Sequence, residues 1–286
     1  MISVKWLPTS LLLAGCAVVS STPQDTSSAP MNEPQANEPG VFRSLAYGQG
    51  SFRMLDLFAP MHKQEEPLVV FVHGGAWQGG SRGEYDKICL KLQKLGIAAA
   101  TVDYRLSPSV THPAHAEDAA AALDWLYSHA GKFRYDPAKI FLVGHSAGGH
   151  IAGTIVTDPK LTAKAHIAGF VGLEGIYDIP NLAKRWPTYP NWFLNRAFGA
   201  DQTKWAAASP TRLKVVGATP WLLVHSKADE LVDMGQMDDF AAHLEKSGVS
   251  VKVLRPEKKT HDGVVESLAQ PNDDVAAAII EFVKTR

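Results

Sequence analysis

The segment Gly144-His145-Ser146-Ala147-Gly148 constrains this chain most, because it joins two patterns that few folds connect. The apolar run at 139–143 before it predicts a buried strand, and the run 149–156 after it predicts a helix. A turn this sharp needs small residues on both sides of Ser146, which explains the glycines. The Ser146 hydroxyl then projects from the sheet, where a base and a substrate can reach it. The alternative is a glycine-rich turn whose serine only caps the helix.

Strand-like and helix-like segments alternate along the rest of the chain. The predicted strands are 52–58, 68–72, 97–102, 139–143, 166–173, 220–224 and 249–254, and the predicted helices are 84–95, 114–129, 149–156, 237–246 and 273–284. This alternation predicts one α/β domain over residues 41–286, with a mostly parallel central sheet flanked by helices.

A segment rich in aromatic residues and proline, 176–208, interrupts the alternation. An insertion of this kind late in a parallel fold predicts a small cap over a pocket. A helical cluster that merely packs on the body fits the same composition. The candidate pocket residues are Trp77, His145, Trp186 and Trp192.

A serine nucleophile needs a base to take its proton, and the base needs an acid to orient it. His261 follows the predicted strand 249–254, and Asp229 follows the predicted strand 220–224. Loops at the carboxyl ends of parallel strands meet at one edge of the sheet. The sequence therefore predicts Ser146, Asp229 and His261, in that chain order, as a catalytic triad.

Other residues compete for these roles. The chain contains 11 histidines, and any one of them can be a surface or capping residue. His225 precedes Asp229 and is a candidate for the pocket wall. Glu230 and Asp233 are alternative acids because they lie close to Asp229, and Glu174 is another because it follows the preceding predicted strand, 166–173.

The glycine turn His73-Gly74-Gly75-Ala76-Trp77 follows the predicted strand that ends at Val72. Its backbone N–H groups can point inward without obstruction by side chains. One oxyanion donor is expected on this loop, at Gly75 or Ala76, and the other at Ala147, directly after the serine. Such a donor is worth about 3–4 kcal/mol of activation barrier.

The amino terminus has the pattern of an export signal. A positive charge at Lys5 precedes a mostly apolar run, 6–19, that is too short to span a bilayer, which needs about 20 apolar residues. The run contains Leu13-Ala14-Gly15-Cys16, which resembles the lipobox of bacterial lipoproteins. The resemblance implies a signal peptide at 1–15 and a lipidated Cys16. The alternative is an ordinary signal peptide with an incidental cysteine.

Residues 16–40 are then expected to include a polar, flexible tether. Ala17, rather than aspartate, follows Cys16, which resembles outer-membrane sorting on the periplasmic side of a bacterial envelope. The remaining cysteine, Cys89, has apolar helical neighbours and is predicted to be a buried thiol.

The net charge of −1 gives no indication of a nucleic-acid partner. No closely spaced metal-ligand pattern such as HExxH or CxxC occurs, so we expect neither a metal nor a cofactor. The oligomeric state is not predicted.

Several motifs together resemble the carboxylesterase branch of the α/β-hydrolases, which includes hormone-sensitive-lipase-like esterases and kynurenine formamidases. They are His73-Gly74-Gly75, Asp103-Tyr104-Arg105-Leu106-Ser107-Pro108, His112-Pro113, Asp118, Leu123-Asp124-Trp125-Leu126 and the serine turn. The resemblance covers roughly Leu55 to Val283 and implies the α/β-hydrolase fold. Ala76-Trp77 and His145 depart from the hormone-sensitive-lipase pattern and are similar to the formamidase-like and small bacterial esterase subgroup.

The expected function is hydrolysis of short-chain or aromatic carboxylic esters through an acyl-enzyme on Ser146. The partners are then a small-molecule ester and, through the lipid on Cys16, a membrane. The alternatives are an arylformamidase-type amidase, a polysaccharide deacetylase or feruloyl esterase, and a binding scaffold that kept the fold without the chemistry.

Overall fold

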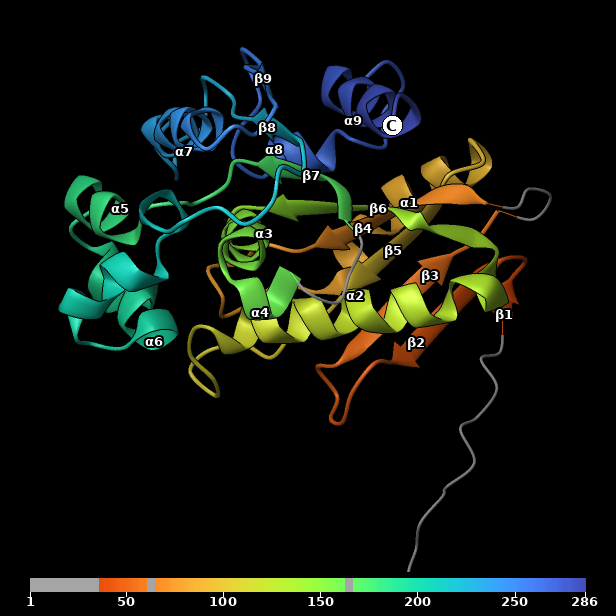
Figure 1. The fold of residues 1–286 in the computed structure, drawn as a ribbon, viewed down its shortest axis with the longest axis horizontal. Coiled ribbons are helices and arrows are strands. Elements are labelled where there is room, and N and C mark those ends of the chain that lie inside the picture. The colour runs from red at the N-terminus through yellow and green to blue at the C-terminus, as the bar shows by residue number, and fades with distance from the viewer. Residues whose placement is uncertain (1–35, 61–64, 163–166) are drawn as a thin grey trace, which may run out of the picture. The chain divides into compact units, whose positions relative to one another are not determined.

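The computed structural model describes residues 36–60, 65–162 and 167–286 (Figure 1). The predicted signal peptide, Cys16 and the tether as far as residue 35 lie outside the described residues. No helix within the described ranges is both long enough and apolar enough to cross a membrane.

The described strands form one sheet in the order β1-β2-β3-β5-β4-β6-β7-β8-β9. Their bounds are β1 Ala36–Glu38, β2 Val41–Ala46, β3 Met54–Phe58, β4 Glu66–Val72, β5 Ala98–Val102, β6 Tyr135–His145, β7 Ile167–Leu173, β8 Trp221–Val224 and β9 Val251–Leu254. The strands from β5 across to β9 pair in parallel, and the pairs formed by β1, β2, β3 and β5 are antiparallel. The mostly parallel sheet predicted from the alternating pattern is therefore confirmed.

The strands β1 and β2 at the antiparallel edge were not predicted from the sequence. β1 lies inside the segment assigned to the tether, so the described fold begins before residue 41. The sequence of β1, Ala-Asn-Glu, has no apolar strand pattern. Backbone pairing with β2, with Glu38 opposite Val41, holds it in the sheet instead.

Helices cover both faces of the sheet (Figure 1). Their bounds are α1 Asp86–Lys94, α2 Ala114–Phe133, α3 Ala147–Thr157, α4 Pro159–Thr162, α5 Ile179–Arg185, α6 Asn195–Phe198, α7 Gly235–Lys246, α8 Gly263–Glu266 and α9 Asp274–Lys284. Alternate residues of β4 point to opposite faces. Leu68 and Val70 join the core under α2, α3 and α7, whereas Val69 and Phe71 join the core under α1 and α9.

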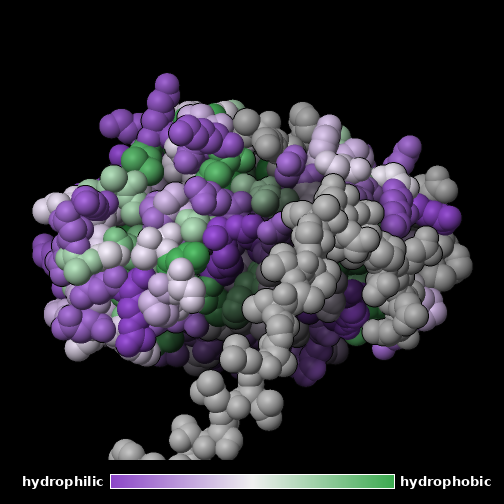
Figure 2. Space-filling view, turned by 90° about the horizontal axis from the view of Figure 1, so that it is seen from below, coloured by the Kyte–Doolittle hydropathy of each residue, from purple (hydrophilic) through white to green (hydrophobic). Residues whose placement is uncertain are grey.

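The predicted cap segment folds into short helical pieces. They are α5, a π-helical turn Pro190–Leu194, α6 and a 3₁₀ helix Gln202–Ala208. Leu194, Ala197 and Trp205 are buried, so part of this segment packs on the body as a satellite cluster. The face seen in Figure 2, where grey atoms do not cover it, is mainly hydrophilic, with apolar side chains in small groups.

Candidate active site

Ser146 occupies the turn between β6 and α3 in a strained backbone conformation, with φ 54° and ψ −116°. A non-glycine residue at positive φ costs about 1–3 kcal/mol, which the surrounding structure must offset. A Cβ on Gly144 would lie 2.2 Å from the Gly148 carbonyl oxygen, and a Cβ on Gly148 would lie 2.2 Å from that of Val72. The close approach of these backbones is the physical reason for glycine on both sides of the serine.

The predicted acid and base come together on loops after β8 and β9. His261 Nδ1 lies 2.9 Å from Asp229 Oδ2, and Asp229 Oδ1 accepts the backbone N–H groups of Leu231 and Val232 at 2.8 and 2.9 Å. Burial alone would raise the pKa of Asp229. The hydrogen bonds from His225 and His261 outweigh burial and hold this pKa well below its usual range. Asp229 is thus a carboxylate that orients the His261 ring.

Ser146 and His261 line the same cavity, which has a volume of about 770 Å³. Both residues are largely buried. Within the described ranges, the Ser146 hydroxyl forms no hydrogen bond with another protein group.

The glycine turn after β4 lies against the serine. A Cβ on Gly74 would be 3.1 Å from Ser146 Cβ, and Gly75 and Ala76 line the cavity. Ala147 begins α3, where the first N–H groups have no partner inside the helix. Among the described backbone contacts, the N–H groups of Ala76 and Ala147 have no protein acceptor. They are therefore free to bind an anionic oxygen.

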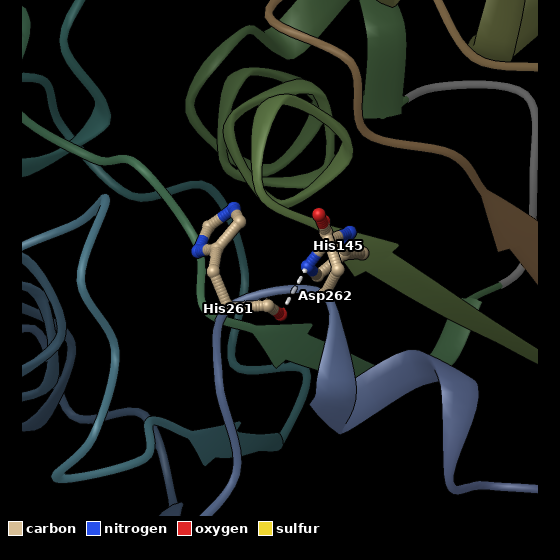
Figure 3. Close-up of side chains that lie close together, drawn as sticks. All are labelled: His145, His261 and Asp262. Atoms are coloured by element: carbon tan, nitrogen blue, oxygen red, sulfur yellow. Dashed lines mark hydrogen bonds between the residues drawn. The ribbon is translucent and has the colours of Figure 1, made fainter.

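His145 contacts the loop that carries the predicted base, His261. Its Nε2 donates a hydrogen bond of 3.0 Å to the His261 carbonyl oxygen, while the His261 ring turns away from this contact (Figure 3). Burial, with a smaller effect of His261, lowers the pKa of His145 to about 3. A neutral His145 thus lines the cavity and holds the backbone of His261. Glu230 supports the same loop by accepting the His261 N–H at 3.2 Å.

His225, predicted as a candidate for the pocket wall, and Glu174, predicted as an alternative acid, both lie next to Asp229. His225 is fully buried and lies 3.3 Å from Asp229 Oδ2 through its Nε2, so it is not part of the pocket wall. Glu174 is also fully buried at the end of β7 and lies 3.3 Å from the same nitrogen. Asp233 instead pairs with Arg185 at the surface, at 3.4 Å.

The cavity lining contains both aromatic or apolar residues and carboxylates. The apolar lining is Ile176, Tyr189, Trp192, Phe193, Leu231, Val232 and Val265, and the carboxylates are Glu84, Asp262 and Glu266. Of the candidate pocket residues, His145 and Trp192 line the cavity. Asp262 directly follows the predicted base and could have been found from that position.

The candidates Trp77 and Trp186 do not belong to the cavity lining that the structure describes. Trp77 is fully buried, with Phe198 at a ring-centroid distance of 4.8 Å, because its positive φ of 54° turns the side chain into the core. Trp186 stacks on Tyr189, with ring centroids 5.7 Å apart, and supports the wall from behind.

Two clusters bring potential metal ligands within 4.8 Å of one another, namely His145 with His261 and Asp262, and Glu174 with His225 and Asp229. Most of these atoms already have protein partners. His145 Nε2 donates to a carbonyl group, His261 Nδ1 contacts Asp229, and both Asp229 oxygens have N–H neighbours. These atoms of His145, His261 and Asp229 are therefore already engaged within the protein.

A parallel sheet, a strained serine turn and a histidine–aspartate pair after later strands define the α/β-hydrolase class. Residues 55–244 match the family model BD-FAE, and the chain belongs to this family of α/β-hydrolases. The structure is similar to that of esterase B from Lactobacillus rhamnosis, with a TM-score of 0.75. The match covers 88% of this chain and 87% of that protein, at 20% sequence identity. This likeness shows the shared fold.

Curated relatives are named as hydrolases. The chain is 32% identical to a kynurenine formamidase from Meyerozyma guilliermondii, over 72% of this chain and 81% of the relative. It is 27% identical to a probable isoprenylcysteine alpha-carbonyl methylesterase, ICMEL1, from Arabidopsis thaliana, over 78% of this chain and 51% of the relative. The chain spans about half the length of that methylesterase.

Proposed function

We propose that this protein is a serine carboxylesterase in which Ser146 is the nucleophile, His261 the base and Asp229 the orienting acid. The contact of 2.9 Å between His261 Nδ1 and Asp229 Oδ2, in a cavity that Ser146 also lines, carries this proposal. The hydrolase names of the relatives support it.

In the proposed reaction, Ser146 Oγ attacks the ester carbonyl carbon while His261 Nε2 takes the hydroxyl proton. The N–H groups of Gly75 or Ala76 and of Ala147 bind the oxyanion. The intermediate collapses, the alcohol leaves with the proton from His261, and an acyl-enzyme remains. Water then gives its proton to His261 and attacks the acyl carbon. Collapse of this second intermediate releases the carboxylic acid and returns the proton to Ser146.

The cavity favours short-chain or aromatic esters. Tyr189, Trp192 and Phe193 offer ring faces and edges to an apolar group, and Glu84 and Glu266 add negative charge to the lining. The lining that the structure describes contains no lysine or arginine. We therefore expect neutral esters to react faster than esters that carry a free carboxylate.

An arylformamidase activity is the second candidate, because the kynurenine formamidase relative is 32% identical. The same triad would cleave a formyl amide, and the aromatic wall would hold the aryl group. Rates on N-formylkynurenine and on p-nitrophenyl acetate, measured with one preparation, separate the two activities.

The decisive experiment is labelling with a fluorophosphonate probe, which reacts with an activated serine. The wild-type chain should be labelled, and Ser146→Ala should lose both labelling and ester hydrolysis by at least about 10³-fold. Normal labelling of Ser146→Ala would contradict the assigned nucleophile.

Residues 1–40 support a second proposal, concerning location. We propose that Cys16 is lipidated and anchors the enzyme to a bacterial cell envelope, at the periplasmic side of the outer membrane. Incorporation of a labelled fatty acid into the wild-type chain, with loss in Cys16→Ser, tests this. Equal incorporation in both chains would contradict it.

A further inference from the structure

Glu174 is a buried acid for which the proposed reaction has no direct use. Its side chain is fully buried, and its backbone has a positive φ of 50°. A glycine would adopt this conformation without steric strain, yet the chain places a large ionisable side chain there. Strain of this kind at a site edge points to a role for the side chain.

The hydrogen bonds around Glu174 and Asp229 are unequal. Asp229 receives the N–H groups of Leu231 and Val232 and the Nδ1 contact of His261. The backbone N–H of Ser226 lies 3.0 and 3.2 Å from the two Glu174 oxygens. The hydrogen bonds therefore stabilise a negative charge on Asp229 much more than on Glu174.

His225 Nε2 lies 3.3 Å from each of the two acids, and one side-chain atom each of Glu174, His225 and Asp229 lie within 4.8 Å of one another. The same nitrogen hydrogen-bonds the Val232 carbonyl oxygen at 3.1 Å, so it carries a proton. The buried Nδ1 of His225 has no hydrogen-bond partner, which is the pattern of a neutral ring. No lysine or arginine forms an ion pair with Glu174 or Asp229 in the described residues. Two buried carboxylates without a compensating cation would be very unfavourable.

We propose that Glu174 is a neutral carboxylic acid that donates its proton to Asp229, and that it positions this carboxylate toward His261. The role in catalysis rests on the proposed esterase function. Glu174 is a positioning residue, because it acts on the reaction through Asp229. A neutral acid resolves the charge imbalance and adds a hydrogen bond to the carboxylate that orients the base.

The charged groups around Glu174 agree with this assignment. Burial is the largest cause that raises the pKa of Glu174, to about 10, and the hydrogen bond with Asp229 adds to it. Glu230, on the same loop as Asp229, raises this pKa further, and the N–H of Ser226 opposes the shift only in part. The other titratable groups that face this acid are His225, Tyr177 and, beyond Asp229, His261.

The stability of Glu174→Gln against pH tests the proton directly and does not require activity. A glutamate that is neutral when folded and ionised when unfolded makes the protein less stable as pH rises above about 4.5 and toward 10. The unfolding constant of wild type, divided by that of Glu174→Gln, should therefore rise about tenfold per pH unit between about pH 6 and 9.

Glu257→Gln is the matched control, because Glu257 is an exposed carboxylate that pairs with Lys227. Its ratio to wild type should stay constant over the same range. A constant ratio for Glu174→Gln as well would show that Glu174 is ionised in the folded protein and would overturn the proposal. If Glu174→Gln does not fold, Glu174→Ala serves in the same comparison, since it removes the same titrating proton.

The pH profile of kcat/KM tests the positioning role. Glu174→Gln keeps a donor to Asp229, so its acid limb should match wild type within about 0.3 pH unit and its rate within about threefold. Glu174→Ala loses the donor, and its acid limb should move upward by about half a pH unit or more, with a lower kcat. Rescue by glutamine but not alanine supports the proposal.

Two outcomes would contradict the positioning role. A downward move of the acid limb in Glu174→Gln would mean that a negative charge had been removed. Equal profiles for all three proteins would mean that Glu174 only fills space. If the wild-type protein does not hydrolyse esters, the proposed esterase function is wrong. The ratio of unfolding constants would still show whether Glu174 holds the proton.

Discussion

The serine turn between β6 and α3 and the acid loops, which follow β8 and β9 and carry Asp229 and His261, position their side chains in different ways. At the turn between β6 and α3, backbone packs on backbone, and the Gly148 Cα lies so close to the Val72 carbonyl that a Cβ cannot fit. After β8 and β9, side chains do the positioning, and Asp229 is held by N–H groups from its own loop and by His261. Steric change should therefore damage the first region, and charge or hydrogen-bond change the second.

Asp229→Asn should give the largest effect in the acid region. An amide no longer fixes the protonated nitrogen of His261 and no longer stabilises the cation that forms during attack. We expect kcat for p-nitrophenyl acetate to fall by about 10⁴-fold, with the fold kept, as judged by circular dichroism.

Asp233→Asn is the control for this change, because Asp233 lies at the exposed surface, where its described partners are Arg185 and the backbone N–H of Gly235. It should keep its rate within about twofold. A loss below tenfold in Asp229→Asn would assign the orienting role to another acid.

Gly148→Ala should give the largest effect in the serine turn. The new methyl group would meet the Val72 carbonyl oxygen at 2.2 Å, and backbone cannot yield as a flexible side chain does. We expect the free energy of unfolding to fall by about 2–4 kcal/mol, measured by urea denaturation.

Gly131→Ala is the matched control, since Gly131 lies in α2 and a Cβ there would meet nothing within 4 Å. Alanine is the better helix former, so this variant should be more stable by up to about 1 kcal/mol. Equal destabilisation by both changes would refute the steric account of the turn.

Lowering the pH should destabilise the region around the serine turn more than the loops that carry Asp229 and His261. Burial is the main cause that lowers the pKa of His112 and His115 to about 4, of His145 to about 3, and of His73 and His150 below the usual value. Between about pH 6.5 and 4 the unfolded chain binds protons that the folded chain does not, so stability falls as pH falls.

Each such histidine contributes up to about 1.4 kcal/mol per pH unit in this window. We expect the free energy of unfolding to drop by at least about 2 kcal/mol between about pH 6.5 and 5. Urea denaturation at several pH values measures it, and a flat curve over this window would show that these rings are already charged in the folded protein.

The serine turn could be predicted from sequence because its rule is local. Small residues at fixed offsets, after one apolar run and before another, are sufficient to place Ser146. Asp229 and His261 followed from their positions after strands. The sequence could not show which acid carries the proton, because that depends on N–H groups and a histidine brought together from β7 and β8.

The pocket was predicted less well for a similar reason. Trp77 ends the glycine turn, yet its side chain is buried in the core, whereas Trp192 lines the cavity. β1 was missed because it forms by backbone pairing without an apolar pattern. Side-chain direction and edge pairing depend on contacts between distant segments, and composition alone does not contain that information.

Trp192→Ala should give the smallest effect and tests whether the aromatic wall contributes to specificity. Trp192 is 60% exposed at the cavity, with its ring centroid 5.7 Å from that of Tyr189 and 5.5 Å from that of Phe193. Loss of one aromatic contact, worth about 1 kcal/mol, should raise KM for aromatic esters by about fivefold. The KM for aliphatic acetate esters should stay within about twofold of the wild-type value. Phe52→Ala is the control, because Phe52 is 49% exposed and does not line the cavity. An equal change for aliphatic and aromatic esters would mean that Trp192 acts on the fold of the cap rather than on the substrate.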